Sequence, residues 1–221
     1  MTLPRSTASA QPPDLEESVL TAFPTPVANL LWPDSGPLNS LLRELVLAEE
    51  RRGPGLARSN EGGWHSALDF LTREADCIRH LRRRIEQVVD GLTRRFARPT
   101  ATDRPIRYHV EGWANVLRAG QYHSVHCHPN AFWSGVYYVT DIDSSPDHPA
   151  SGKLELVDPR PVASASYAEL TNLYGRLLLR PQAGQMIVFP SWLQHFVHPY
   201  FGPGERISVA FNASIVQQRE P

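Results

Sequence analysis

The sequence predicts a mainly β domain with flanking α-helices, an α+β fold, on two observations. The 20 prolines favour loops and strand edges over a helical bundle. After Pro99 the chain also changes from segments with helical periodicity to short alternating or apolar segments separated by turn residues. Several short strands at close spacing are typical of a sandwich, a jelly roll or a barrel.

The first part of the chain is expected to form two helices, within about residues 36–97. Residues 36–52 place leucines and a valine on one helical face and end at the Gly-Pro-Gly turn of residues 53–55. Residues 73–97 carry apolar side chains at steps of three and four, which predicts a second amphipathic helix.

The strands are expected in a β core of about residues 105–216. β-Branched and aromatic residues, period-two alternation and flanking turn residues identify them. Gly112 could bend the first strand, and a turn at residues 182–184 divides the fourth segment. The predicted strands lie within residues 108–120, 134–142, 152–159, 176–190 and 206–216.

Length and composition suit one domain of ordinary size. Of the 221 residues, 41% are hydrophobic, which is enough for a core. Residues 1–18 have the Pro, Ser and acidic content of a flexible N-terminal leader and lack the apolar stretch of a signal peptide. We therefore expect a leader over residues 1–18 and a single domain over residues 19–221.

Charge and cysteine content limit the partners and the compartment. A net charge of −1 gives no reason to expect a nucleic-acid or membrane-surface partner, and the apolar runs are too short to span a bilayer. Cys77 and Cys127 lie far apart, so a reducing, cytoplasmic location is expected rather than a disulfide framework. A small-molecule substrate is expected in preference to a peptidyl target. The oligomeric state is left open, with a homodimer as one option.

Three of the nine histidines fall in the short stretch "HSVHCHP", which looks like part of a metal site. In an extended strand, side chains two apart share a face and neighbours point to opposite faces. His126 and His128 would therefore chelate one ion together. Cys127 would point away into the core, and His123 would face the opposite side. Two imidazoles make a weak site, so a third ligand must come from elsewhere.

A second histidine cluster, "FPSWLQHFVHPY", follows an apolar strand and is the obvious source of that ligand. Next along the chain, Arg206 and Ser208 share one face of a predicted strand. Arginine binds carboxylates through a planar, bidentate fork. A cation beside candidate metal ligands therefore indicates an anionic ligand.

The order of the motifs resembles a known superfamily. The segments are "HCHPNAFWSGVYYV", "SGKLELVDPR", "PQAGQMIVFPSWLQHFVHP" and "ERISVAFN", preceded by "FPTPV", "SNEGGWHS" and "WANVL". Together they resemble the iron(II)/2-oxoglutarate-dependent dioxygenases, and more narrowly a set of small bacterial 2OG-Fe(II) oxygenases, from about Ala22 to Asn212. The resemblance implies a double-stranded β-helix, or jelly roll, with the N-terminal helices packed against it.

The resemblance also implies roles for individual residues. His126 matches the first iron ligand and His195 the distal one, while Arg206, with Ser208, matches the arginine that holds the distal carboxylate of 2-oxoglutarate. Tyr138 resembles a strand tyrosine that contacts the same carboxylate in some members.

The superfamily usually has an acid two residues after the first histidine, and this chain has His128 there. A three-histidine site of His126, His128 and His195 is the first interpretation, since neutral imidazole suits Fe(II). A two-histidine site with an extra open position is the second. The third takes an acid from a distant segment, such as Asp158.

Other candidates would line the pocket. Trp113 and Asn115 share one face of a strand, so Asn115 is a candidate contact of the cosubstrate and Trp113 of the substrate. His123 is a further candidate beside the substrate. Trp133 and Trp192 flank the histidine segments and could form the hydrophobic walls typical of small-molecule sites. Beyond the metal ligands, no catalytic residue is assigned.

The expected function is that of an Fe(II)/2-oxoglutarate-dependent dioxygenase, with O2 as the other cosubstrate. It would hydroxylate an unactivated C–H bond of a small molecule, an amino acid or a secondary metabolite, and release succinate and CO2. One alternative is a three-histidine dioxygenase of cupin type that does not use 2-oxoglutarate. Another is a metal-binding jelly roll without catalytic turnover.

Overall fold

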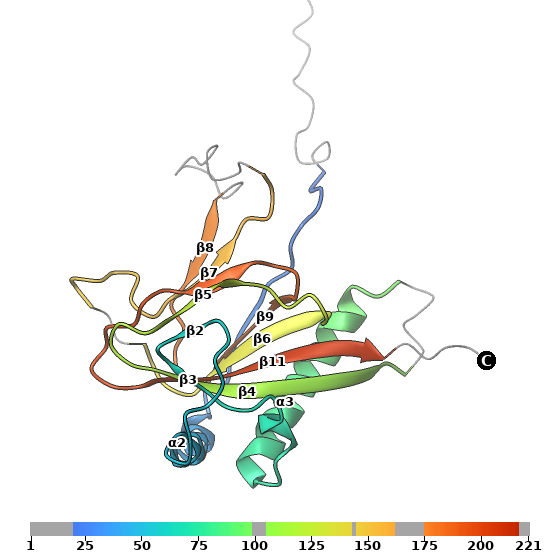
Figure 1. Cartoon of the computed structure of the whole chain (residues 1–221). Coiled ribbons are helices and arrows are strands. Elements are labelled where there is room, and N and C mark those ends of the chain that lie inside the picture. The colour runs from blue at the N-terminus through green and yellow to red at the C-terminus, as the bar shows by residue number, and fades with distance from the viewer. Residues whose placement is uncertain (1–19, 99–104, 143–144, 162–174, 217–221) are drawn as a thin grey trace, which may run out of the picture.

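The computed structural model describes residues 20–98, 105–142, 145–161 and 175–216 (Figure 1). The expected leader of residues 1–18 lies outside this part of the chain. Two antiparallel sheets face each other. The major sheet has the strand order β1-β9-β6-β11-β4-β3, and the minor sheet has the order β2-β5-β10-β7-β8. The predicted mainly β fold is thereby confirmed.

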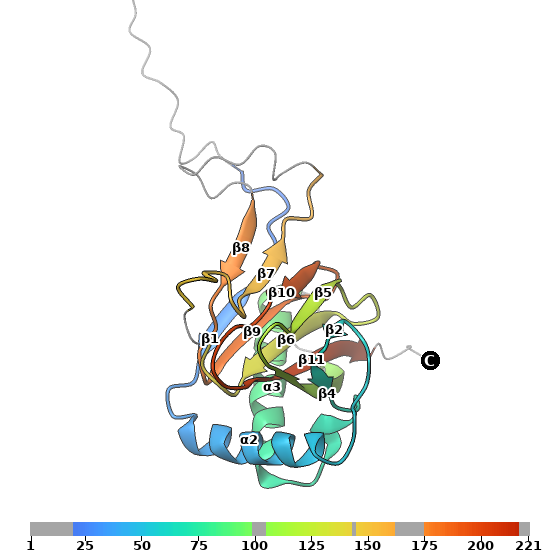
Figure 2. The same ribbon diagram turned by 60° about the vertical axis from the view of Figure 1, so that its left-hand side comes forward.

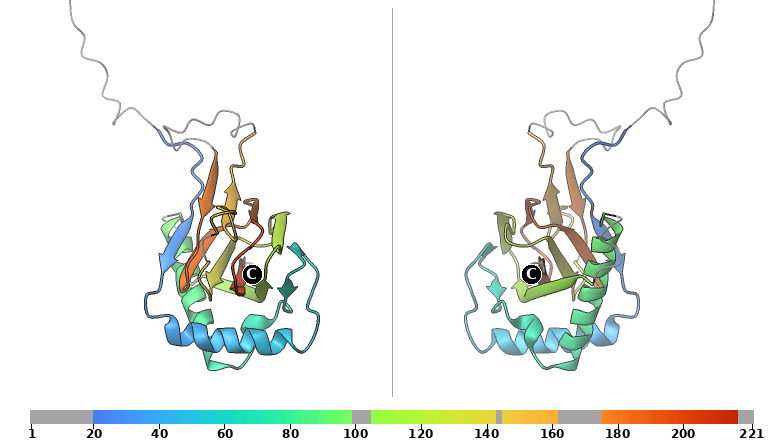
Figure 3. Two further views of the ribbon diagram at one scale, coloured as in Figure 1. Left: turned by 90° about the vertical axis from the view of Figure 1, so that its left-hand side faces the viewer. Right: turned by 90° about the vertical axis from the view of Figure 1, so that its right-hand side faces the viewer.

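Two helices cover the outer face of the major sheet (Figures 2 and 3). They are α2 (Gly36–Glu50), with a proline in its first turn, and α3 (Asp76–Arg95), and a short 3-10 helix, η1 (Phe70–Thr72), lies between them in the chain. The apolar stripe of α3 and the outward side chains of β11 share one buried cluster with α2. The helices therefore sit on the side of the major sheet that faces away from the minor sheet.

The strands alternate between the two sheets in the manner of a double-stranded β-helix. The turn at residues 182–184, for example, carries the chain from β8 in the minor sheet to β9 in the major sheet. The bounds are β1 Ala28–Leu31, β2 Asn60–Glu61, β3 Trp64–His65, β4 Arg107–Leu117, β5 Tyr122–His126, β6 Trp133–Tyr138, β7 Leu154–Val157, β8 Arg176–Leu179, β9 Gln185–Pro190, β10 His195–Val197 and β11 Arg206–Val216.

β4 and β11 are neighbours in the major sheet and pair along their whole length. β4 is one continuous strand through Gly112, where the sequence left a bend open. η1 packs on the strand at this point. A Cβ at Gly112 would lie 2.4 Å from Cδ1 of Leu71, so only glycine allows this close approach.

The space between the sheets is only partly filled. A second apolar cluster, which includes Leu117, Ile187 and Leu193, occupies one part of it. Alternate residues of β4, β6 and β11 line a cavity in the remainder. Among the described residues, no helix combines the length and the apolar character needed to cross a membrane.

Candidate active site

Three histidines converge at the cavity from the minor sheet. His126 ends β5, His128 follows it, and His195 begins β10, where it is the register partner of His126. One ring nitrogen from each can be chosen so that all three lie within 4.8 Å of one another. The group contains no carboxylate among the described residues. Asp158, the distant acid considered above, instead bonds to the side chain of Arg160.

Backbone carbonyls fix the tautomers of two of these rings. Nδ1 of His126 lies 2.7 Å from the carbonyl oxygen of Ser124, and Nδ1 of His195 lies 2.9 Å from that of Leu193. A carbonyl only accepts, so both Nδ1 atoms carry the proton and both Nε2 atoms are unprotonated. Nε2 of His126 lies 3.4 Å from Oγ of Ser59. Metal-binding histidines are oriented in this way by a partner on the other ring nitrogen.

Burial keeps the three imidazoles neutral. It holds the pKa of His128 at about 4 and that of His195 at about 3, with a further contribution from the neighbouring His126. The pKa of His126 is also lowered by burial, and its bond to the Ser124 carbonyl partly offsets this. At neutral pH all three lone pairs are therefore available. Three neutral nitrogen donors fit Fe(II).

His123 lies in the same cavity, although regular extension of β5 would turn it away. The pairing of β5 with β10 shifts register between His126, opposite His195, and His123, opposite Val197. β5 thus contains one extra residue, a β-bulge, which resets which side chains face inward. His123 is buried, and burial lowers its pKa well below the ordinary value. The parity argument was wrong for His123.

Cys127, between His126 and His128, is exposed rather than part of the core. The expectation that it points away from the histidines holds, but its expected burial is wrong. No core covers this side of the segment, because the minor sheet carries no helix among the described residues. Cys77 is the buried cysteine of the pair.

Arg206 lies at one end of the cavity as a buried cation with no carboxylate within 4.0 Å among the described residues. Its side chain is 1% exposed. Nε donates to the carbonyl of Gly152 at 3.0 Å, and one terminal nitrogen lies 3.4 Å from Oγ of Ser208. The other terminal nitrogen has no partner. A buried charge without a counterion is costly, so this end of the cavity is built for an anion.

Further polar atoms without partners surround this cation. The hydroxyl of Tyr138 and Oδ1 of Asn115 are buried and make no hydrogen bond, and the same is true of Nε2 of His123. The ring of Tyr138 lies under the guanidinium, 5.1 Å from ring centroid to Cζ of Arg206. Burial raises the pKa of Tyr138 to about 12, so it is a hydrogen-bond donor at neutral pH. Buried polar groups are normally paired, and an absent ligand explains this set.

The cavity has a volume of about 390 Å³ and brings together most of the residues singled out from the sequence. Trp113 lies beside the histidines, with its ring centroid 5.7 Å from that of His128. Trp133 and Trp192 are not among the lining residues. Trp133 bonds to Thr93 on the helix side of β6, and Trp192 is 51% exposed. The lining residues from the sequence analysis are Trp113, Asn115, His123, His126, His128, Tyr138, His195, Arg206 and Ser208.

Sequence reasoning assigned no role to several other lining residues. His65 on β3 is the register partner of Asn115 and stacks on Trp113, with 5.5 Å between ring centroids. Glu111 and Asn212 face each other at the far end of the cavity. The sequence shows that Glu111 shares a strand face with Trp113, and Asn212 with Arg206 and Ser208. It does not show that this face is the one turned toward the cavity, because that depends on which face of the sheet the helices cover.

Comparisons with known proteins match part of the chain to one family. Residues 111–212, which contain all three histidines and Arg206, match the model of a family described as "Putative 2OG-Fe(II) oxygenase". No curated protein sequence matches the chain.

Solved structures show the same fold at low sequence identity. A prolyl-4-hydroxylase of Pseudomonas putida is 15% identical with a TM-score of 0.62, and the match covers 85% of this chain and 91% of that one. A Trichoplax adhaerens prolyl hydroxylase, in complex with a hypoxia inducible factor peptide fragment, is 16% identical with a TM-score of 0.58, covering 85% and 83%. HygX of Streptomyces hygroscopicus, with nickel, 2-oxoglutarate and hygromycin B, is 11% identical with a TM-score of 0.57, covering 86% and 83%.

The fold is a double-stranded β-helix, and its histidine cluster could hold a metal ion. The family match over residues 111–212 and the shared fold support the iron(II)/2-oxoglutarate-dependent oxygenase superfamily, which the motifs resemble. Members of this superfamily are oxidoreductases that use Fe(II), 2-oxoglutarate and O2, and the donor set and the buried arginine fit these cofactors.

Proposed function

We propose that the protein is an Fe(II)/2-oxoglutarate-dependent hydroxylase of a small molecule. The observation that supports this most strongly is one cavity that contains three neutral imidazoles and, at its end, the buried unpaired cation of Arg206. The imidazoles offer a metal site, and the cation offers a carboxylate site. 2-Oxoglutarate is a ligand that needs both.

His126, His128 and His195 would hold the iron. Three imidazoles leave it one charge unit more positive than the usual site with two histidines and a carboxylate, and the dianionic cosubstrate offsets that charge. Arg206 and Ser208 would bind the distal carboxylate, with a hydrogen bond from the hydroxyl of Tyr138. Asn115, whose amide faces the same end, would hold the cosubstrate in place.

When bound together, Fe(II) and 2-oxoglutarate supply the oxidising chemistry: O2 converts 2-oxoglutarate to succinate and CO2, and its second oxygen atom enters a substrate C–H bond. The protein's own contribution is orientation and the exclusion of water. Trp113 and His123 border the space where a substrate would sit beside the histidines.

The test is an anaerobic titration of the protein with Fe(II) and 2-oxoglutarate. We expect a visible metal-to-ligand charge-transfer band, followed by succinate release when O2 is admitted. Iron binding without any 2-oxoglutarate binding would favour the dioxygenase that is independent of 2-oxoglutarate. A protein that forms the band but never yields succinate would be the non-catalytic binder. Absence of both iron and 2-oxoglutarate binding would overturn the proposal.

A further inference from the structure

The cavity has a second polar end, away from Arg206. Every second residue of β11 from Arg206 to Asn212 lines the cavity, and the register places Asn212 opposite Glu111 on β4 at this second end. Six residues of strand span about 20 Å. The anion-binding end and Glu111 are therefore at opposite ends of one cavity.

A chain of hydrogen bonds holds Glu111 in place. Oγ of Ser134 lies 2.8 Å from Oδ1 of Asn212, and Nδ2 of Asn212 donates to Oε1 of Glu111 at 3.1 Å. A carboxylate only accepts, so the amide nitrogen of Asn212 must face Glu111 and its oxygen must face Ser134. The orientation of all three side chains is thereby fixed. Glu111 keeps most of its acceptor capacity for a ligand.

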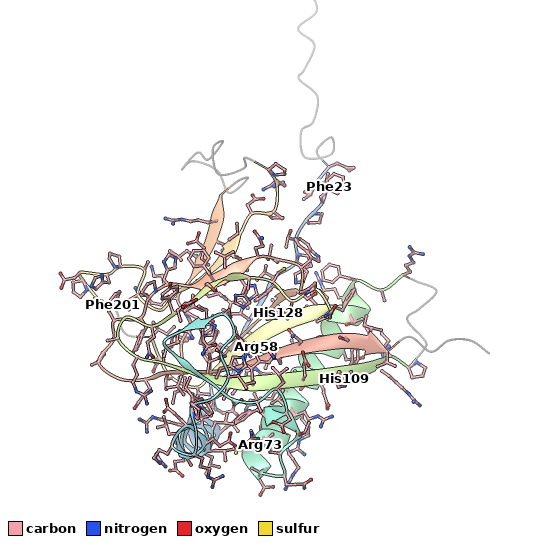
Figure 4. The ribbon with its side chains drawn as sticks, in the orientation of Figure 1. Phe23, Arg58, Arg73, His109, His128 and Phe201 are labelled. Carbon is pink, nitrogen blue, oxygen red and sulfur yellow. The ribbon has the colours of Figure 1, made fainter. Side chains whose placement is uncertain are left out.

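Glu111 also has no counterion. No lysine, arginine or histidine nitrogen lies within 4.0 Å of its carboxylate in the part of the chain that the structure describes, although Glu111 is only partly exposed. Arg58 lines the same cavity, and among the described residues it forms neither an ion pair nor a side-chain hydrogen bond (Figure 4). Two opposite charges thus face one cavity without neutralising each other.

Glu111 lies close to the histidines but not among them. It is two residues from Trp113 on β4, a separation of about 7 Å along the strand, and the ring of Trp113 is beside His128. A group bound to Glu111 therefore lies beyond the histidines as seen from Arg206. A C–H bond a few bonds away from that group would reach the histidine cluster.

We propose that Glu111 binds a protonated amine of the substrate and that Arg58 binds the carboxylate of a zwitterionic one, so that the substrate class is amines, and amino acids in particular. This inference rests on the proposed function. The amine is assigned from the carboxylate of Glu111, which its hydrogen bond to Asn212 holds in place without neutralising its charge. The substrate carboxylate is assigned from the guanidinium of Arg58, which lines the same cavity.

The experiment uses the full chain with Fe(II) and a panel of probes. The panel contains the free protein amino acids, their Nα-acetyl derivatives, their methyl esters, and unbranched alkylamines and diamines. Succinate release in air reports stimulation of turnover, and anaerobic calorimetry with Fe(II) and 2-oxoglutarate reports binding. We expect compounds with a free amine to bind and to stimulate succinate release, and acetylation of that amine to abolish both.

Variants assign the two charges. Glu111→Gln keeps a partner for Asn212 but removes the charge, and we expect the concentration of amine for half-maximal stimulation to rise at least tenfold. Glu61→Gln, an exposed acid outside the cavity, is the matched control and should leave that concentration unchanged. If the substrate is a zwitterion, methyl esters should bind worse than free acids, and Arg58→Gln should remove that difference. If methyl esters and free acids bind equally well, Arg58 does not bind a substrate carboxylate, and only the binding of the amine by Glu111 is retained.

Failure of this inference differs from failure of the proposed function. If wild type forms the charge-transfer band but no amine binds, or if Glu111→Gln binds amines as wild type does, the amine subsite is overturned and the oxygenase stands. If the band and succinate are absent, the proposed function fails. Calorimetric amine binding that depends on Glu111 would still support the subsite.

Discussion

His126 on β5 and His195 on β10 are register partners in the minor sheet, with their imidazole ring centroids 4.3 Å apart. Backbone pairing therefore sets the positions of two of the three candidate metal ligands. His128 lies beyond the end of β5, where its backbone N–H donates to the carbonyl of Ser191 at 2.8 Å. Its side chain is the candidate ligand least fixed by the sheet, and it stands where the superfamily that the motifs resemble usually has an acid.

We expect His128→Ala to weaken Fe(II) binding by about tenfold or more, because one of three donors is lost. His128→Asp should retain binding, since a carboxylate oxygen is a hard donor that Fe(II) also accepts. Anaerobic competition against a coloured chelator measures both affinities. His109→Ala is the control, because His109 is exposed and lies along β4, away from His128 (Figure 4). Unchanged iron affinity in His128→Ala would remove His128 from the site.

Arg206→Met should have opposite effects on stability and on ligand binding. Without a ligand, removal of an unpaired buried cation should leave the free energy of unfolding unchanged or raise it by about 1 kcal/mol or more. Urea unfolding of the Ni(II)-loaded protein with 2-oxoglutarate at a hundred times its Kd should show a gain of about 2.7 kcal/mol for wild type. The variant should show none. Arg83→Met, at an exposed position on α3, should keep the full gain; an equal gain in Arg206→Met would contradict the assigned carboxylate site.

Gly135 on β6 leaves room for the ring of Phe211, and a Cβ there would lie 2.3 Å from Cζ of that ring and 2.9 Å from the carbonyl oxygen of Ile187. Gly135→Ala should therefore lower the free energy of unfolding by about 1–3 kcal/mol through overpacking. Gly91→Ala is a suitable control, since nothing lies within 4 Å of its added Cβ in α3 and helix propensity predicts a small gain. Urea denaturation compares the two, and a neutral Gly135→Ala would show that the ring can move.

His65 should make the metal-free protein less stable in mild acid. Burial lowers its pKa below the ordinary value of 6.5, so the folded state holds the ring neutral while the unfolded chain protonates it. This contribution to stability is complete above pH 6.5 and is lost progressively as the pH falls below that value. His65→Gln should reduce the decline in unfolding free energy between pH 7 and pH 5. Identical slopes for the variant and wild type would show that His65 is not held neutral.

The sequence predicted the parts of the fold that local periodicity encodes. The two helices and the strands β4, β6, β7, β8, β9 and β11 lie close to their expected bounds, because each carries its own apolar pattern. β1 was not expected, since Ala28–Leu31 is a short edge strand defined by its pairing with β9 far along the chain. Its structure follows from a partner rather than from its own residues.

For the candidate site, the order of the motifs predicted that the three histidines and Arg206 lie at one site, and the structure places all four at one cavity. Strand parity misplaced His123, because a register shift against β10 cannot be read from β5 alone. Glu111 was not singled out, since an isolated acid on a strand looks like any solvated residue until its hydrogen bond to Asn212 is seen. The tertiary pairing of β4 with β11 supplies that information.

The extra residue in β5 has a consequence for how such proteins diverge. The number of residues in this short strand, as well as their identity, determines which side chains face the cavity. Removal of one residue between His123 and His126 would leave them two apart, a spacing at which regular extension turns both side chains to the same face. The odd spacing of the two histidines is therefore what requires the bulge, and a strand shorter by one residue would present the same pair without it.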